Sequence, residues 1–252
     1  MRRLALLVSV GIASLSLAPS AHAADESQIF EKHSRDYESP QHFAFELRLA
    51  PYKADIDSDP ALHVATPYAS VFGDTQHLLI AAEFDWQVFH FPHLGSIGPG
   101  FSAGYTSMSA RATRLDTGQP SGEDTNLDVY PMYAVAVFRL DVLNKDLGIP
   151  LVPYAKAGAG LAFWRAYNDG GTSYTNGIAG KGHTFGYHVA AGIGLDLNAF
   201  DRTAAHNFDE SMGVNHTYIY GEWMFMGLNG IGQDGALRVG TSTWVAGLAL
   251  EF

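Results

Sequence analysis

The chain contains no cysteine, and after its first two dozen residues it has no apolar run long enough to cross a bilayer as a helix. The first absence excludes disulfide bonds, thiolate chemistry and cysteine-based metal sites. The second excludes membrane-spanning helices, which need about 20 apolar residues. Basic residues are also scarce, with 15 Lys and Arg against 26 Asp and Glu. Such an acidic chain is a poor partner for nucleic acid, and no Pro-rich or Ser-rich linker divides it into two domains.

The first 23 residues have the three parts of a secretory signal peptide. Arg2 and Arg3 provide a positive start, Leu4 to Leu17 is a short apolar stretch, and Ala21-His22-Ala23 is a small-x-small cleavage sequence. We therefore expect export and cleavage before Ala24, with a periplasmic segment over 24–40 and one folded unit over 41–252.

The rest of the chain alternates apolar with small or polar side chains at every second residue, as strands do. Eight such segments are long enough to cross a bilayer, which takes roughly 9 to 11 tilted residues, and a closed barrel needs an even number of strands. The segments are Gln41 to Ala50, His77 to His90, Pro99 to Ala110, Leu127 to Leu140, Pro150 to Trp164, Thr184 to Asn198, His216 to Met226 and Val239 to Phe252. In the fourth segment the apolar face is expected to comprise Val129, Tyr133, Val135 and Val137.

Long polar connections alternate with short ones, which is typical of outer-membrane barrels with long outer loops and short periplasmic turns. One connection on the short-turn side is longer. In it Ala204, Ala205, Phe208 and Met212 recur at three- and four-residue steps, which predicts a short amphipathic helix at the periplasmic end. The predicted fold is an all-β, eight-stranded, antiparallel up-and-down transmembrane barrel with this one periplasmic helix.

A soluble eight-stranded barrel such as a lipocalin has the same period but hides its apolar face inside, so periodicity alone does not exclude it. Three features favour the membrane: the length of the segments, the Gly- and Ala-rich opposite face, and the aromatic residue Phe252. A soluble barrel would instead carry abundant Lys and Glu outside. The aromatic residues expected to face lipid are Phe43, Phe84, Trp86, Phe101, Phe163, Phe185, Trp223, Trp244 and Phe252.

Three segments carry a family resemblance: Trp244 to Phe252, Pro153 to Gly160 and Gly186 to Asp196. They resemble strands of small Gram-negative outer-membrane barrels of the OmpA and OmpW kind. The resemblance implies an outer-membrane location, periplasmic termini, contact with lipid and lipopolysaccharide, and assembly by the barrel-insertion machinery. It also implies that the C-terminal insertion signal consists of Trp244, Leu248, Leu250 and Phe252. The oligomeric state stays open.

Charged residues on the opposite face are the best candidates for a site, because an unpaired charge in a narrow lumen is costly. The expected lumen charge network is Glu46, Arg48, Glu83, Asp85, Lys156, Asp196 and Glu222. We expect Arg48 to pair with Glu83 or Asp85, and Lys156 to pair with Asp196 or with a carboxylate of another strand. The network either fills and pins the barrel or lines a narrow path.

The function predicted from the sequence is a structural or surface-interaction role with loops exposed outside the cell. A narrow, porin-like channel and a lipid A-modifying enzyme are the alternatives, although neither a catalytic group nor a cofactor is expected. The enzyme would use His183 or His77 with Ser173 or Ser107, and the interaction surface would use Tyr167, Tyr174 and Asn176. The spacing of Asp55, Asp57 and Asp59 resembles a calcium loop, but Pro60 stands where that loop needs glycine, so an exposed acidic loop is expected.

Overall fold

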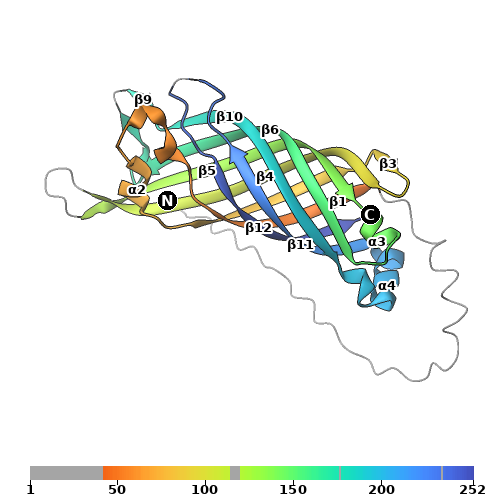
Figure 1. Ribbon diagram of the computed structural model, residues 1–252. Coiled ribbons are helices and arrows are strands. Elements are labelled where there is room, and N and C mark those ends of the chain that lie inside the picture. The colour runs from red at the N-terminus through yellow and green to blue at the C-terminus, as the bar shows by residue number, and fades with distance from the viewer. Residues whose placement is uncertain (1–41, 114–119, 176, 234) are drawn as a thin grey trace, which may run out of the picture. The chain divides into compact units, whose positions relative to one another are not determined.

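The computed structural model describes residues 42–113, 120–175, 177–233 and 235–252. In this part of the chain eight long strands form one closed antiparallel barrel (Figure 1). Neighbouring strands follow the order β10-β11-β12-β1-β2-β4-β5-β6, and β10 pairs with β6 to close the ring. The predicted fold class is therefore confirmed.

Seven of the eight strands begin and end within four residues of the predicted segments, whereas β5 begins seven residues earlier. The barrel strands are β1 (Phe43–Tyr52), β2 (His77–Trp86), β4 (Gly95–Thr113), β5 (Pro120–Leu140), β6 (Leu151–Asn168), β10 (Lys181–Asp196), β11 (His216–Gly227) and β12 (Thr241–Glu251). The short strands are β3 (Phe89–Phe91), β7 (Gly171–Thr172), β8 (Tyr174–Thr175) and β9 (Ile178–Ala179). The helices are η1 (Ile56–Ser58), η2 (Pro60–Leu62), α2 (Pro67–Phe72), α3 (Val142–Lys145), η3 (Leu197–Ala199) and α4 (Arg202–Met212).

The two ends of the barrel differ. At the terminal end, Phe43 and Phe252 exchange backbone hydrogen bonds of 2.9 and 3.0 Å, and the connections that carry β3, α3 and α4 lie at this end (Figure 1). At the loop end, the connection between β1 and β2 folds into η1, η2 and α2.

The outward face of the barrel is apolar. Along β2, for example, Ile80, Phe84 and Trp86 are exposed, while the alternating Glu83 and Asp85 are buried inside. The aromatic residues expected to contact lipid also face outward. Eight of them are 39 to 59% exposed, and Phe43 is partly exposed. The nine residues are Phe43, Phe84, Trp86, Phe101, Phe163, Phe185, Trp223, Trp244 and Phe252. A soluble barrel would have the opposite facing.

The predicted facing of β5 is wrong. Val129, Tyr133, Val135 and Val137 all lie inside the barrel, each at most 5% exposed. Arg139 has the same parity as these residues, and it is buried as well. A guanidinium on the lipid side would be costly, so the arginine and its acidic partners place this face of β5 inward, and small residues such as Ala134 and Ala136 face out.

Helix α4 is the predicted amphipathic helix, and its existence is confirmed. Asp201 caps its N-terminus by accepting a hydrogen bond from Ala204 N at 2.9 Å. One face carries the exposed apolar residues Phe208 and Met212, and on the other His206 Nε2 lies 3.3 Å from Glu210 Oε1. Among the described residues, no helix is both long and apolar enough to cross a membrane.

Candidate functional site: the filled barrel interior

Arg48 lies at the centre of an ion-pair network inside the barrel. Its Nη1 contacts Glu83 at 2.9 Å and Glu46 at 3.2 Å, and its Nη2 contacts Glu222. Of the two partners expected for Arg48, the structure shows Glu83. Because all four side chains are almost fully buried, each charge depends on its partners for stabilisation.

Lys156 Nζ lies between two carboxylates from other strands, Glu46 at 2.6 Å and Glu83 at 2.5 Å, with Glu222 at 3.9 Å. Of the two alternatives expected for Lys156, the structure shows the pairing with carboxylates of other strands, and Asp196 has different partners. Asp196 is buried elsewhere, near the terminal end. There its Oδ2 is 3.0 Å from His216 Nδ1 and accepts from Asn144 Nδ2 at 2.7 Å.

Arg139 is the residue that the sequence analysis missed. It reaches Glu46 at 2.9 Å, Asp85 at 2.7 Å and Glu251 at 2.8 Å, so it joins three acidic residues that Arg48 and Lys156 do not neutralise alone. One signal could have identified it, because an arginine within a membrane strand is disfavoured on the lipid side and finds acidic partners in the lumen.

The network holds five carboxylates and three cations, and neutral donors supply the remaining contacts. Tyr154 OH donates to Glu222 at 2.9 Å, Tyr218 OH donates to Glu251 at 2.9 Å, and Gln87 Nε2 also donates to Glu251 at 2.8 Å. Among the described residues, Asp85 Oδ1 and Arg139 Nε stay without a hydrogen-bond partner, whereas Glu222 and Glu251 each accept from several donors and so favour one arrangement of the strands. The charged members are Glu46, Arg48, Glu83, Asp85, Arg139, Lys156, Glu222 and Glu251.

Glu46, Glu83 and Asp85 each offer an oxygen within 4.8 Å of the others, a spacing that could hold a metal ion. Lys156 Nζ, however, contacts both glutamates at 2.5 to 2.6 Å and takes the place that such an ion would need. These three carboxylates therefore suit an ion-pair network with Lys156 better than a metal site.

Towards the loop end the interior becomes apolar. Tyr68 of α2 is 1% exposed, and its hydroxyl contacts Met108 Sδ at 3.3 Å. Tyr52 OH donates to Val239 O at 2.6 Å. The side chains that pack together here include Tyr52, Tyr68, Leu79, Met108, Val129, Tyr133, Met226, Leu228 and Val239.

Asp57 holds α2 in this position. Its two oxygens accept hydrogen bonds from Tyr68 N at 2.7 Å and Ala69 N at 2.9 Å, the free amides at the start of the helix. Burial raises the pKa of the Tyr68 phenol, whereas a hydrogen bond from Lys53 lowers the pKa of Asp74 in the same connection. The connection between β1 and β2, which contains the acidic residues Asp55, Asp57 and Asp59, therefore closes the loop end of the barrel.

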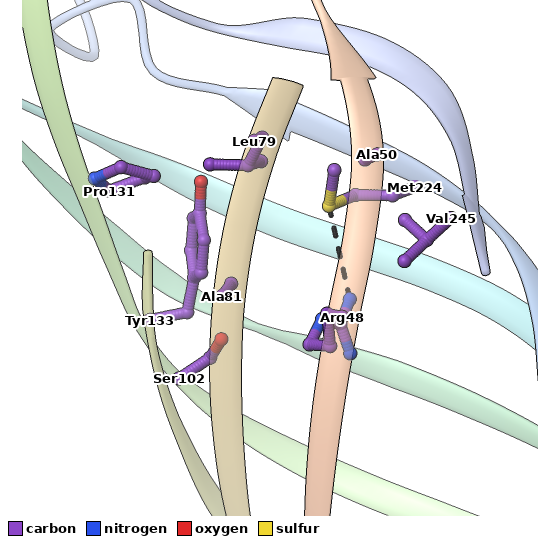
Figure 2. A pocket seen from close by; sticks show the side chains of 9 residues that line it. All are labelled: Arg48, Ala50, Leu79, Ala81, Ser102, Pro131, Tyr133, Met224 and Val245. Atoms are coloured by element: carbon purple, nitrogen blue, oxygen red, sulfur yellow. Dashed lines mark hydrogen bonds between the residues drawn. The ribbon is translucent and has the colours of Figure 1, made fainter. Parts of the chain in front are cut away.

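Between the charged and apolar parts lies a cavity of about 10 Å³ (Figure 2). Arg48 and Met224 face each other there at 3.9 Å, and Leu79, Ala81 and Tyr133 line the other sides. A single water molecule needs about 10 to 15 Å³. This cavity thus holds no more than about one water molecule, and side chains fill the space around it, as an eight-stranded barrel allows.

The residues considered for an enzyme are not joined in a catalytic arrangement. Among the described residues, neither His77 nor His183 is hydrogen-bonded to Ser107 or Ser173, and His183 instead packs near the rings of Phe163 and Phe185. Of the residues expected in a loop surface, Tyr174 is 69% exposed and Tyr167 is half-buried, whereas Asn176 lies outside the described residues. That the protein is not an enzyme stays a prediction.

A closed eight-stranded barrel with an apolar exterior and an ion-paired interior defines the class: the chain has the fold of a small outer-membrane β-barrel. Its solved structural neighbours belong to the same class. They are Ail of Yersinia pestis in complex with the heparin analogue sucrose octasulfate (14% identity, TM-score 0.42, 84% of this chain and 97% of that one) and the Neisserial surface protein NspA (12%, 0.43, 85% and 98%). A third is the N-terminal β-barrel domain of Pseudomonas aeruginosa OprF (10%, 0.36, 84% and 100%).

No family model matches the sequence, and no curated protein is similar to it. The class therefore rests on the strand register and the facing of the chain's own residues.

Proposed function

We propose that this protein is a surface-interaction barrel of the outer membrane, with the loop end outside the cell and the terminal end in the periplasm. In this proposal residues 1–23 are the signal peptide, 24–40 are a periplasmic segment, and 41–252 form the barrel. Lipid and lipopolysaccharide surround the barrel, and the insertion machinery recognises Trp244, Leu248, Leu250 and Phe252.

The observation that carries the proposal is the contrast between a filled interior and extended outer strands. Ion pairs and apolar side chains cross the lumen, and the cavity between them is only about 10 Å³, so the outer surface is the part best placed to act. β4, β5, β6 and β10 have 19, 21, 18 and 16 residues, whereas β1 and β2 have 10 each. Roughly 9 to 11 residues cross the bilayer, so these four strands continue beyond it as a sheet.

The continuing sheet has unpaired strand edges. β2 pairs with β4 only as far as Tyr105, while β4 pairs with β5 up to Thr113. On the other flank, β11 pairs with β10 from Tyr187, so 181–186 pair with no strand other than β6, although Phe185 O accepts a hydrogen bond from Gly230 N at 2.8 Å. A strand edge offers backbone donors and acceptors to an added strand of a partner protein.

A shortened hairpin tests the proposal. Residues 111–124 are replaced by Asn-Gly, which joins the paired residues Ala110 and Thr125 by a two-residue turn. We expect cells with the shortened protein to lose adhesion to protein-coated surfaces while the barrel still shows a heat-modifiable band. Equal adhesion of cells with the full and the shortened barrel would contradict the proposal.

The channel alternative has a direct test in planar bilayers. We expect no single-channel conductance from the purified barrel. Steady conductance steps that change when Arg48 and Lys156 are replaced would support the channel instead. Mass spectrometry of lipid A from cells with and without the protein tests the enzyme alternative, for which an unchanged acyl pattern is expected.

A further inference from the structure

The first and last strands are paired over only part of their length. The ladder between β1 and β12 runs from Ala44 with Glu251 to Leu49 with Ala246. Beyond it, Asp55 N donates to Gly240 O at 2.9 Å in the same register. The junction between β1 and β12, called the seam from here on, is therefore open over 50–54 and 241–245. It is closed on both sides of this gap.

Pro51 explains the gap. Phe43 and Phe252 exchange both backbone hydrogen bonds, and in an antiparallel ladder every second pair does the same. Counting along this register places Pro51 opposite Trp244 in a pair of that kind. Proline has no N–H to donate, so the ladder is interrupted there although β1 continues to pair with β2 as far as Tyr52.

A cleft of about 360 Å³ opens at this gap, a size within the range of small-ligand sites. Phe225 and Ser242 belong to the outward, lipid-facing side of their strands, whereas Met226 is buried on the inward side. The lining residues are Pro51, Lys53, Ala54, Asp55, Asp57, Gln76, Phe225, Met226, Thr241, Ser242 and Thr243.

The cleft lies at the level of the lipid head groups. Trp223 and Trp244 are directly opposite each other in the β11–β12 ladder and are 59% and 55% exposed. Exposed tryptophans of this kind form the girdle at a membrane interface. Phe225 and Ser242 are the next outward-facing pair towards the loop end, and Ser242 Oγ accepts a hydrogen bond from Trp223 Nε1 at 3.1 Å.

The polar groups of the cleft suit hydroxyl groups better than phosphate. The Lys53 ammonium is paired with Asp74, and the Asp57 carboxylate is engaged by the amides of α2. The remaining polar side chains are the Asp55 carboxylate, the Gln76 amide and the hydroxyls of Thr241, Ser242 and Thr243. These groups accept from and donate to sugar hydroxyls, while the acidic lining repels an anion.

We propose that this seam cleft binds the sugar head group of an outer-leaflet amphiphile, with the acyl chain lying along Phe225 on the apolar exterior. Assignment to the outer leaflet rests on the proposed orientation of the barrel. The continuity of the cleft with the lipid-facing surface selects an amphiphile as the occupant, and the hydroxyl and carboxylate lining selects a sugar as its head group.

The test is native mass spectrometry of the purified full-length barrel with three probes: dodecyl maltoside, dodecylphosphocholine and free maltose. We expect one dodecyl maltoside to be retained, and neither of the other probes. Equal retention of dodecylphosphocholine would show general lipid adsorption, and equal retention of free maltose would show a site for saccharides alone. Either result would overturn the proposal.

Two variants locate the site. Pro51→Ala restores an N–H to the seam and should close the cleft and abolish retention, whereas Pro99→Ala, a matched change on the exterior of β4, should leave retention unchanged. Asp55→Asn combined with Gln76→Ala removes head-group contacts without touching the seam, and should lower retention about tenfold, the effect of two hydrogen bonds. Unchanged retention in both cleft variants would sink the proposal. Because no cell-surface partner takes part in this measurement, equal adhesion in the hairpin test would contradict the proposed function without changing the retention expected here.

Discussion

Arg139 of β5 donates a hydrogen bond from Nη1 to Glu251 Oε1 of β12 at 2.8 Å, although three strands separate β5 from β12 in either direction around the barrel. The two residues therefore belong to opposite walls. Lys156 of β6 and Glu46 of β1 make a second contact of this kind at 2.6 Å. Such contacts connect walls that share no backbone hydrogen bond, and they fill the space through which a solute would pass.

Replacing Arg139 with Leu should destabilise the barrel strongly, because Asp85 and Glu251 would then stay buried without their cation. Breaking a buried ion pair in this way costs roughly 3 to 5 kcal/mol. Urea unfolding of the refolded protein in detergent or lipid measures the loss. The exposed Arg165 is the matched control, for which Arg165→Leu should change stability by less than about 0.5 kcal/mol. Equal losses in the two variants would contradict the structural role of Arg139.

Lys156→Met should weaken the barrel without making it conduct. The substitution leaves Glu46 and Glu83 facing each other without the ammonium between them, so the temperature at which the folded band disappears from a gel should fall. The apolar packing around Tyr68 and Met108 remains, so the variant should still show no conductance in planar bilayers. Open-channel currents in this variant would show that the charged layer alone blocks a path.

The packing of α2 should respond to alkaline pH. Burial raises the pKa of Tyr68, so the folded state favours the neutral phenol. Its contribution to stability is complete below the ordinary tyrosine pKa of about 10, and it is lost as the pH rises towards the raised pKa. Urea midpoints of the wild type should therefore fall more steeply above pH 10 than those of Tyr68→Phe. Parallel pH profiles of the two proteins would rule out this role for the phenol.

Asp57→Ala should release α2 from the barrel mouth. The variant loses both hydrogen bonds to the first amides of the helix, and loss of such a cap costs about 0.5 to 2 kcal/mol. Because the chain has no native cysteine, Met108→Cys reports on opening through its rate of maleimide labelling. Labelling should be faster with Asp57→Ala than with Asp169→Ala, a change of an exposed aspartate. Identical labelling rates in the two variants would show that Asp57 does not keep α2 at the barrel mouth.

Strand periodicity was sufficient to predict the number of strands, their order and the outward face of seven of them. Successive side chains must point to opposite sides of a strand, so Phe84 and Glu83 could be assigned from the sequence alone. The fourth strand failed because valines and tyrosine occupy its inner face, and their hydrophobicity matches a lipid-facing row. Only Arg139, a single charged residue on the same face, indicated that this face points into the barrel.

The sequence by itself determined which residues alternate, and hence that the chain makes a barrel with an apolar exterior. Only the tertiary structure decided the partners of each buried charge, because Arg139 and Glu251 are over a hundred residues apart and meet only when the ring of strands closes. It also decided that α2 fills the barrel mouth and that the seam at Pro51 is open. These features depend on how distant segments meet across the barrel, and periodicity within one strand contains no information on that.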